Sequence, residues 1–247
     1  MSVSVGSPGR LLGLGLGPGD PELVTLKAAR CLREAAVVTY FCKKGRRGHA
    51  RTIVEGLMPE RCEELPLAYP VTTEIPVHDS GYAACLAPFY ETAAAALAEH
   101  LEAGRDVALL CEGDPLFYGS FMHLYVRLRD RFAVEIVPGV SGMSGCWTAA
   151  GLPMSWGDDV LTVLPGTLPF AALRDRLMAS DASVVMKIGS NFAKVRDAVL
   201  AAGLMEEAVY VERGTMTGER VMPLREKLDG EAPYFSIVLL PGNGRRP

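Results

Sequence analysis

Two glycine-rich turns hold the residues of this chain that are best suited to bind a ligand. The first, 13–21, reads Gly-Leu-Gly-Leu-Gly-Pro-Gly-Asp-Pro, and the second, 112–120, reads Glu-Gly-Asp-Pro-Leu-Phe-Tyr-Gly-Ser. Each adjoins an apolar run that predicts a β-strand, and glycine there lets backbone approach a ligand closely. Gly-Asp-Pro alone is ordinary turn chemistry. Two such turns at strand ends predict one ligand crevice, because open α/β sheets bind ligands beyond the carboxyl ends of their strands.

The first turn does not fit a nucleotide-binding loop. Its glycines occur at every second position. A G-x-G-x-x-G pattern that begins at Gly15 needs its third glycine at position 20, which is Asp20. The strand predicted over 36–41 is followed by Cys42, Lys43 and Lys44 rather than by an acidic residue for a ribose. The sequence also lacks the G-x-x-x-x-G-K-[ST] loop. These features favour a ligand with a small polar head and no phosphate.

The composition is that of an ordinary globular protein. The chain has 247 residues, of which 49% are hydrophobic and 22% charged, enough for one large or two small domains. Its net charge of −4 gives no global reason to expect nucleic acid as a partner. No apolar run approaches the ~20 residues of a membrane span, and the first residues lack a signal-peptide pattern. We therefore expect a cytoplasmic protein with no membrane or nucleic-acid partner.

The cysteines and histidines show neither a disulfide framework nor a metal-ligand pattern. The six cysteines form no C-x-x-C pair, and Cys31, Cys85 and Cys111 lie in apolar runs, which predicts buried thiols in a reducing compartment. No ligand spacing relates the four histidines, which are His49, His78, His100 and His123. We expect no metal.

An alternation of strands and helices must position the two turns. Asp20 is well placed to cap the first helix, with Pro21 at its first position. An apolar helical stripe follows at Leu23, Leu26, Ala29 and Leu32. The alanine-rich stretch 82–103 predicts a helix in which Pro88 marks a kink or a late start. Further elements are expected as strands near 10–15, 36–41, 63–67, 107–111 and 134–137, a short helix after 43–51, and a helix near 120–129.

A second α/β pattern begins after residue 137, at Pro-Gly-Val-Ser-Gly. It predicts strands near 160–164, 183–188, 208–212 and 235–240, and helices up to 150 and near 171–178 and 192–202. No low-complexity linker separates the halves, and the second half has no second GxGPGD loop. We predict two α/β domains with mixed sheets, residues 1–137 and 138–247, with a trough between them, a frequent place for small-molecule sites.

Four segments together resemble the tetrapyrrole methylase family: Gly-Leu-Gly-Pro-Gly-Asp-Pro-Glu-Leu at 15–23, Cys-Glu-Gly-Asp-Pro-Leu-Phe-Tyr-Gly-Ser-Phe at 111–121, Val-Pro-Gly-Val-Ser at 137–141 and Met-Lys-Ile-Gly at 186–189. The resemblance runs from about residue 10 to 240. The run at 112–121, with 69–70 and 233–236, is similar to the branch that methylates C20 of precorrin-2 to precorrin-3A in cobalamin (vitamin B12) biosynthesis. The resemblance implies a class III methyltransferase of two α/β domains that binds cofactor and substrate in the trough.

The resemblance also implies a homodimer and S-adenosylmethionine as the cofactor, with S-adenosylhomocysteine as its product. Carried over by motif, the implied cofactor-binding residues are Pro18, Glu112, Gly113, Asp114, Phe117, Ser141, Gly142, Ile188 and Gly214. Turn geometry is the alternative explanation for Gly113 and Ser141, and core packing is the alternative for Phe117 and Ile188.

A tetrapyrrole substrate carries many carboxylates, so its site needs cations. The chain has a basic segment at 43–51, directly after a predicted strand, and we expect it to form a loop over the substrate. A solvated surface loop is the alternative. The candidate substrate-binding residues are Lys43, Lys44, Arg46, Arg47, His49 and Arg51 in this segment, with Lys187 and Arg213 from the second domain.

Methyl transfer from a sulfonium depends on alignment of the reacting atoms more than on covalent help. A proton must later leave the methylated carbon, and Asp114, Glu112 and Tyr118 are candidate acceptors because they lie in the 112–118 turn. Turn capping and packing are the alternative for each. Other functions left open are methylation of cobalt-factor II, of another macrocycle carbon, of diphthamide or of ribosomal RNA, and non-catalytic binding of a tetrapyrrole.

Overall fold

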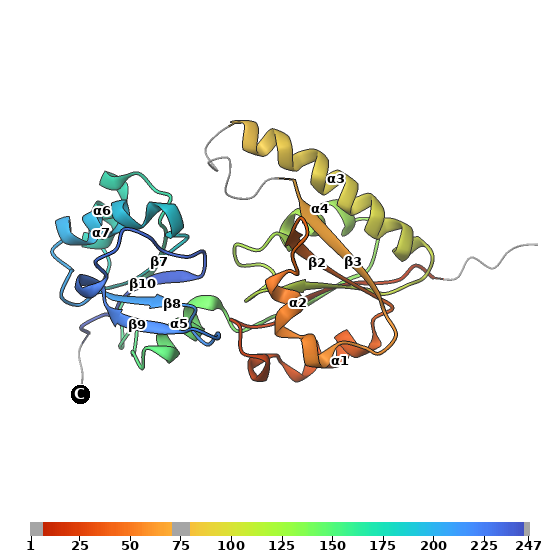
Figure 1. Cartoon of the computed structure of the whole chain (residues 1–247), viewed down its shortest axis with the longest axis horizontal. Helices are drawn as coiled ribbons and strands as arrows, with labels where there is room; N and C mark the ends of the chain where they lie inside the picture. Colours follow the sequence, from red (N-terminus) through yellow and green to blue (C-terminus); the bar gives the residue numbers. More distant parts are fainter. Residues whose placement is uncertain (1–6, 71–79, 245–247) are drawn as a thin grey trace, which may run out of the picture. The chain divides into compact units, whose positions relative to one another are not determined.

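The computed structural model describes residues 7–70 and 80–244. The chain divides into two compact units, Met1–Ser141 and Gly142–Pro247. Each unit has its own five-stranded sheet with helices packed on it (Figure 1). The prediction of two α/β domains is confirmed in this architecture.

The first unit is built on a wholly parallel sheet in the order β3-β2-β4-β1-β5. We expected mixed sheets in both domains. This sheet is instead wholly parallel, because each connection crosses back over the sheet before the next strand begins. Gly15 at the end of β1 is in register with Cys111 of β4, and Leu14 with Val137 of β5, so three strands end at one edge. The strands are β1 Leu11–Gly15, β2 Val37–Lys43, β3 Glu63–Tyr69, β4 Val107–Cys111 and β5 Val134–Val137.

Helices cover both faces of this sheet (Figure 1). Successive strand residues point to opposite faces: Leu11 packs in one core with α3 and α4, and Leu12 in another with α1 and α2. Strands buried on both faces read as continuous apolar runs, as β4 does. The helices are α1 Leu26–Glu34, α2 His49–Ile53, α3 Ser80–Glu102 and α4 Phe121–Leu128, with 3₁₀ turns η1 Pro21–Leu23 and η2 Glu55–Leu57.

The start of the first helix differs from the prediction. Asp20 caps the 3₁₀ turn η1, its Oδ1 accepting the Glu22 N–H at 2.8 Å. The α-helix begins later, where Thr25 Oγ1 accepts the Ala28 N–H at 3.1 Å. The predicted stripe is therefore wrong at Leu26, which is 91% exposed, because the delayed start turns it away from the core. The buried residues of α1 are Ala28, Ala29, Cys31 and Leu32.

The structure excludes one of the two alternatives for Pro88 in α3 and corrects the expectation for Cys85. The helix continues through Pro88 rather than starting late there. Pro88 and Cys85 are both exposed, because the packed face of α3 is formed by Tyr90, Leu97 and their helical neighbours. Cys85 is therefore not the buried thiol that its apolar run predicted, whereas Cys31 and Cys111 are buried.

The second unit has a mixed sheet in the order β6-β7-β10-β8-β9. Strands β6 and β7 are parallel, β10 is antiparallel to both β7 and β8, and β8 is antiparallel to β9. Helices α6 and α7 pack on one face and α5 on the other. The bounds are β6 Leu161–Pro165, β7 Ala182–Met186, β8 Val209–Glu212, β9 Arg220–Pro223, β10 Ser236–Leu240, α5 Gly142–Ala149, α6 Phe170–Met178, α7 Phe192–Ala201, η3 Gly189–Asn191 and η4 Leu224–Glu226.

The edge strand β9 was not predicted. It is short, and Arg220 and Val221 are both exposed, so it has neither a continuous apolar run nor a regular alternation of buried residues. Across the described part of the chain, no helix is long and apolar enough to cross a membrane.

Candidate functional site

Three glycines pack backbone against backbone where β4, β1 and β5 end. A Cβ on Gly15 would lie 2.4 Å from the Gly139 nitrogen, and one on Gly139 would lie 2.1 Å from the Gly113 oxygen. Gly113 itself has φ +64°, a conformation that suits glycine. The turn geometry that we considered as an alternative for Gly113 is therefore present.

Backbone hydrogen bonds join the two glycine-rich turns. The Leu16 N–H donates to the Cys111 oxygen at 2.9 Å, and the Gly113 N–H donates to the Gly17 oxygen at 2.8 Å. Pro18 follows directly and is buried. The structure thus brings Pro18 of the first predicted loop beside the turn that begins at Glu112.

Asp114 ties this turn to the segment after β5. Its Oδ1 accepts the Leu116 N–H at 2.9 Å, and its Oδ2 accepts the Gly139 N–H at 3.2 Å. Both carboxylate oxygens therefore accept hydrogen bonds from backbone N–H groups, and these bonds fix the conformation of the turn. This geometry supports turn capping, rather than proton transfer, for Asp114.

Glu112 and Tyr118 are the other two candidate proton acceptors in this turn. Glu112 Oε1 accepts the Ala50 N–H at 3.0 Å, which links the strand end to α2. Burial raises the pKa of the Glu112 carboxyl, and hydrogen bonds from backbone N–H groups partly offset this rise. Tyr118 has φ +55°, a strained conformation for an aromatic residue, and its ring lies 4.8 Å from that of Phe117. Strain of this kind occurs at functional sites, which makes this turn the strongest candidate site of the first unit.

The basic segment 43–51 is only partly the loop that we expected. Lys43 ends β2, the Arg46 N–H donates to the Lys43 oxygen at 2.9 Å to close a turn, and α2 begins at His49. Lys43, Lys44 and Arg46 are exposed, and none of them has an ion pair within the described ranges. Arg47 pairs with Glu55. The free cations of the segment are therefore concentrated at its first turn.

Arg51 does not lie on an exposed loop, so the prediction is wrong there. It is buried in α2, where its Nε and Nη2 each donate to Glu64 at 2.9 Å. The Tyr40 hydroxyl donates to the same carboxylate at 3.0 Å. The hydrogen bond from Arg51 holds the pKa of Glu64 below its usual value. The Arg51 guanidinium is thus buried and paired with Glu64, so it is not placed to bind a substrate carboxylate.

The predicted residues of the second unit follow β7 and β8. Ile188 lies two residues beyond the end of β7 and is fully buried, which supports core packing for its side chain. Lys187 is exposed with φ +55°. A Cβ on Gly214 would lie 2.8 Å from Cys146 Sγ, so the turn after β8 packs tightly on α5. Gly142 begins α5, directly after Ser141 at the boundary of the two units.

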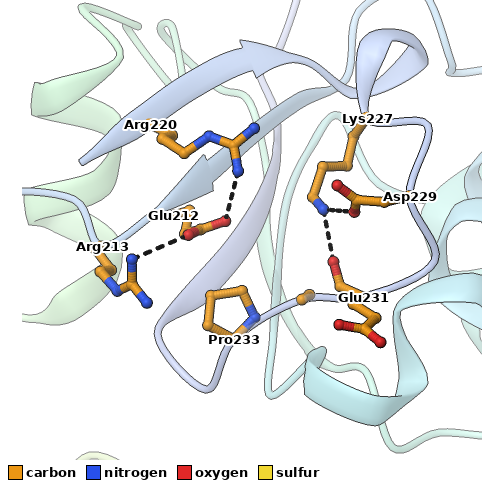
Figure 2. Close-up of a pocket in the computed structure, with 8 residues that line it drawn as sticks. Glu212, Arg213, Arg220, Lys227, Asp229, Glu231 and Pro233 are labelled. Carbon is orange, nitrogen blue, oxygen red and sulfur yellow. Dashed lines mark hydrogen bonds and ion pairs between the residues drawn. The ribbon is translucent and has the colours of Figure 1, made fainter. Parts of the chain in front are cut away.

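A pocket of about 400 Å³ opens beside the same turn of the second unit (Figure 2). Arg213 and Arg220 lie on either side of the buried Glu212, and Lys227 lies across the pocket. Of these residues, only Arg213 was among the predicted substrate-binding side chains. The complete lining is Glu212, Arg213, Arg220, Lys227, Asp229, Glu231, Ala232 and Pro233.

Comparison with known proteins decides the family. Residues 10–228 match the family described as "Tetrapyrrole (Corrin/Porphyrin) Methylases". The chain is also 56% identical over 239 residues to the precorrin-2 C(20)-methyltransferase of Sinorhizobium sp., covering 97% of this chain and 98% of that protein. This chain is a tetrapyrrole methylase. The resemblance in the sequence motifs is thereby confirmed.

Two more distant tetrapyrrole methylases support the assignment. The cobalt-precorrin-2 C(20)-methyltransferase of Salmonella typhimurium is 29% identical over 94% of this chain and 96% of its own length. The structure of uroporphyrin-III C-methyl transferase from Thermus thermophilus, complexed with S-adenyl homocysteine, matches with a TM-score of 0.65 and 27% identity over 94% of this chain and 97% of that one.

Sequence analysis missed residues of this methylase whose role depends on contacts between elements that are far apart in the sequence. Gly15 and Gly139 belong to motifs that we quoted, but their mutual contact requires the parallel pairing of β1 and β5. Arg220 and Lys227 gave no signal beyond being basic residues in a polar stretch. In the described ranges no group of three or more His, Cys, Asp or Glu side chains is arranged to hold a metal. His78 lies outside the described residues.

Proposed function

We propose that this chain transfers a methyl group from S-adenosylmethionine to C20 of precorrin-2, giving precorrin-3A in cobalamin biosynthesis. The observation that carries the proposal is the 56% identity, over almost the full length of both chains, to a precorrin-2 C(20)-methyltransferase. The second candidate is the cobalt-containing substrate, since the Salmonella relative is named for it. The much lower identity to that relative, 29%, favours the metal-free substrate.

The strand-end turns of the first unit have groups that fit the cofactor. S-adenosylmethionine supplies an electrophilic methyl group on a sulfonium, next to an amino-acid part that carries an ammonium. Glu112 follows the end of β4, and its Oε1 accepts the Ala50 N–H. Burial raises the pKa of this carboxyl, and a bound cation would favour its ionised form. We propose that Glu112 holds the ammonium and that backbone at Pro18, Gly113 and Asp114 holds the rest of the amino-acid part. The ligand in the Thermus relative's structure supports a cofactor of this class.

Residues of both units complete the proposed cofactor site. We propose that Phe117, Ser141 and Gly142 contact the cofactor beside the 112–118 turn, and that backbone at Ile188 and Gly214 contributes from the second unit. Because the Ile188 side chain is fully buried, its contribution has to come from backbone or from the shape that it gives the segment after β7.

The main task of these residues is to align the methyl group with the attacking carbon. Alignment at about 3–3.5 Å can supply much of the acceleration of such a reaction. The hydrogen bonds from Leu116 and Gly139 to Asp114 hold the turn in one conformation, which is the rigidity that alignment needs. Lys43, Lys44 and Arg46 are the exposed cations of the first unit that we propose for the substrate carboxylates, with Lys187 and Arg213 from the second.

The test is a parallel assay of three tetrapyrroles with methyl-labelled S-adenosylmethionine. Precorrin-2, cobalt-precorrin-2 and uroporphyrinogen III are offered separately, and the methylated carbon is located by NMR. We expect label at C20 and the highest kcat/KM with precorrin-2. Higher kcat/KM with the cobalt complex would establish the second candidate. Absence of transfer to all three, with the cofactor bound, would support a non-catalytic tetrapyrrole-binding protein instead.

We also propose that the enzyme acts as a cytoplasmic homodimer. The family resemblance supports a dimer, and the six cysteines, all free thiols, fit a reducing compartment. Sedimentation equilibrium at micromolar concentration tests the dimer, and a monomer across that range would contradict it.

A further inference from the structure

We propose that Arg213 and Arg220 form a carboxylate-binding site in the second unit, positioned by the buried Glu212. This inference rests on the proposed function, because the carboxylate belongs either to a side chain of the tetrapyrrole or to the methionine part of the cofactor. Arg213 was predicted from the sequence as one cation among several. The structure adds its partner, the group that orients both, and the pocket that they face (Figure 2).

Glu212 provides the fixed point of this arrangement. Its side chain is only 7% exposed, and the Tyr210 hydroxyl donates to its Oε2 at 3.0 Å. Arg213 Nη1 lies 3.3 Å from Oε1, and Arg220 Nη1 lies 3.6 Å from Oε2. A buried carboxylate held in this way positions two guanidinium groups that come from different strand ends. Arg213 follows β8 and Arg220 begins β9.

The two arginines keep most of their hydrogen-bonding capacity unused. A guanidinium has five N–H donors in a fork that matches a carboxylate. Arg10 and Arg51, by contrast, each donate through two or more nitrogens to acidic side chains. Among the described residues, the side chains of Arg213 and Arg220 donate no hydrogen bond, their contacts with Glu212 being ion pairs, and the two side chains are 44% and 50% exposed. These donors are available to a ligand in the pocket.

The balance of charge favours a single carboxylate on the arginine side of the pocket. Two guanidinium groups share one carboxylate, Glu212, which leaves one net positive charge there. Across the pocket, Lys227 is already engaged by Asp229 and by the Glu231 carbonyl oxygen at 2.6 Å. The Lys227 ammonium also lies 5.2 Å from the centre of the Tyr210 ring, so it is held in place. A monoanion between Arg213 and Arg220 would neutralise the remaining charge and accept their free donors.

The experiment compares single variants of the full-length enzyme in methylation of precorrin-2. Arg220→Gln and Arg213→Gln each remove one guanidinium group. Arg220→Lys retains the positive charge but loses the planar set of N–H donors. Arg225→Gln is the matched control, because Arg225 is similarly exposed but pairs with Glu206 and Glu226 outside the pocket. KM and kcat are measured for precorrin-2, Kd for S-adenosylmethionine by calorimetry, and Tm for each variant.

We expect Arg220→Gln and Arg213→Gln to raise the KM for precorrin-2 about tenfold, equivalent to about 1.4 kcal/mol. The kcat and the cofactor Kd should stay within about twofold, Arg220→Lys should be intermediate, and Arg225→Gln should match the wild type. A tenfold rise in the cofactor Kd instead, with KM unchanged, would assign the carboxylate to S-adenosylmethionine.

The proposal is overturned if KM and Kd in both glutamine variants equal those of Arg225→Gln. It is also overturned if the losses follow a lowered Tm rather than KM, since that result would make the arginines structural. A wild-type enzyme that binds the cofactor but does not methylate precorrin-2 would contradict the proposed function. The cofactor Kd of the variants still tests the carboxylate site in that case.

Discussion

The charged groups of the 112–118 turn differ in how fully the fold itself uses them. Asp114 accepts backbone N–H groups at both oxygens, from Leu116 and Gly139, whereas Glu112 Oε1 accepts the Ala50 N–H from a neighbouring helix. A carboxylate whose two oxygens both accept hydrogen bonds from the turn itself has a structural role there, because removing it would leave those backbone N–H groups without their acceptor. The turn thus contains one carboxylate that caps it through both oxygens and one that links the strand end to α2.

Glu112→Gln and Tyr118→Phe should each reduce single-turnover methylation less than about tenfold when the cofactor is saturating. The attacking carbon is electron-rich, so alignment rather than proton removal should dominate the barrier. A true general base typically contributes ~10²–10⁴-fold. Single-turnover transfer of labelled methyl to precorrin-2 measures the effect, with cofactor Kd determined for each variant. A thousandfold loss at normal affinity would identify the proton acceptor and contradict this expectation.

The buried Arg51 makes the stability of the first unit depend on pH through Glu64. The folded-state pKa of Glu64 lies below its unfolded value, so its contribution is complete above the unfolded pKa of about 4.5 and is lost as pH falls through the folded pKa. Glu64→Gln should therefore cost about 1–2 kcal/mol at pH 7, since the carboxylate is partly exposed, and less at pH 4.

Urea unfolding at several pH values measures this difference in unfolding free energy. Glu34→Gln is the control, because its ion pair with Arg30 is exposed on both sides and should change stability by less than ~0.5 kcal/mol. A cost for Glu64→Gln that stays constant down to pH 3 would show that the pair with Arg51 does not act through ionisation.

At the scale of elements, the strand ends of the first unit depend on contacts that only glycine permits. Gly139→Ala should destabilise the protein by about 3 kcal/mol, because its Cβ would lie 2.1 Å from the Gly113 oxygen and backbone cannot move aside as a side chain can. The matched control is Gly56→Ala, whose Cβ would meet no atom within 4 Å. Thermal unfolding should show a Tm lower by roughly 6–12 °C for the first variant only. Equal Tm values would contradict the close packing of β1, β4 and β5.

The turn between β2 and α2 is the element that we expect to meet substrate carboxylates in the first unit. Lys44→Ala with Arg46→Ala should raise the KM for precorrin-2 several-fold at low ionic strength, and the effect should shrink with added salt. Arg47→Ala is the control, because Arg47 is paired with Glu55. Steady-state kinetics at two salt concentrations provide the measurement. An unchanged KM in the double variant at low salt would make the turn a solvated surface.

Local sequence patterns predicted elements well where propensity and burial agree. Strands β4 and β5 have the predicted bounds, because each is an apolar run between turn residues. The start of α1 was misplaced because Asp20 and Thr25 are both good caps, and the first caps only a 3₁₀ turn. Strand β9 was missed because its pairing with β8, rather than its own residues, makes it a strand.

The candidate site was predictable only as far as motifs reach. The motifs located the 13–21 and 112–120 turns. Which polar side chains are already paired within the protein depends on contacts between residues far apart in the sequence. The ion pair of Arg51 with Glu64 requires α2 to pack beside β3. The ion pairs of Arg213 and Arg220 with Glu212 require β9 to pair with β8. Neither arrangement has a short-range signature in the sequence.

At the scale of the whole molecule, each unit has separate hydrophobic cores on the two faces of its sheet. The proposed cofactor-binding residues come from both units: 18, 112–114 and 117 from the first, 188 and 214 from the second, and Ser141 and Gly142 at the boundary. A ligand that binds only the folded state stabilises it, by about 2.7 kcal/mol at a hundred times its Kd. The proposal therefore predicts that bound cofactor slows local opening in both units.

Hydrogen exchange with S-adenosylmethionine at a hundred times its Kd tests this consequence. We expect slower exchange at 113–118 and 139–142 in the first unit and at 187–189 and 213–215 in the second, because these backbone segments carry the proposed contacts. Adenosine at the same concentration is the control, since it lacks the methionine part and should not protect 113–118. Protection confined to the first unit would contradict the contribution of Ile188 and Gly214, and would leave the second unit with the substrate alone.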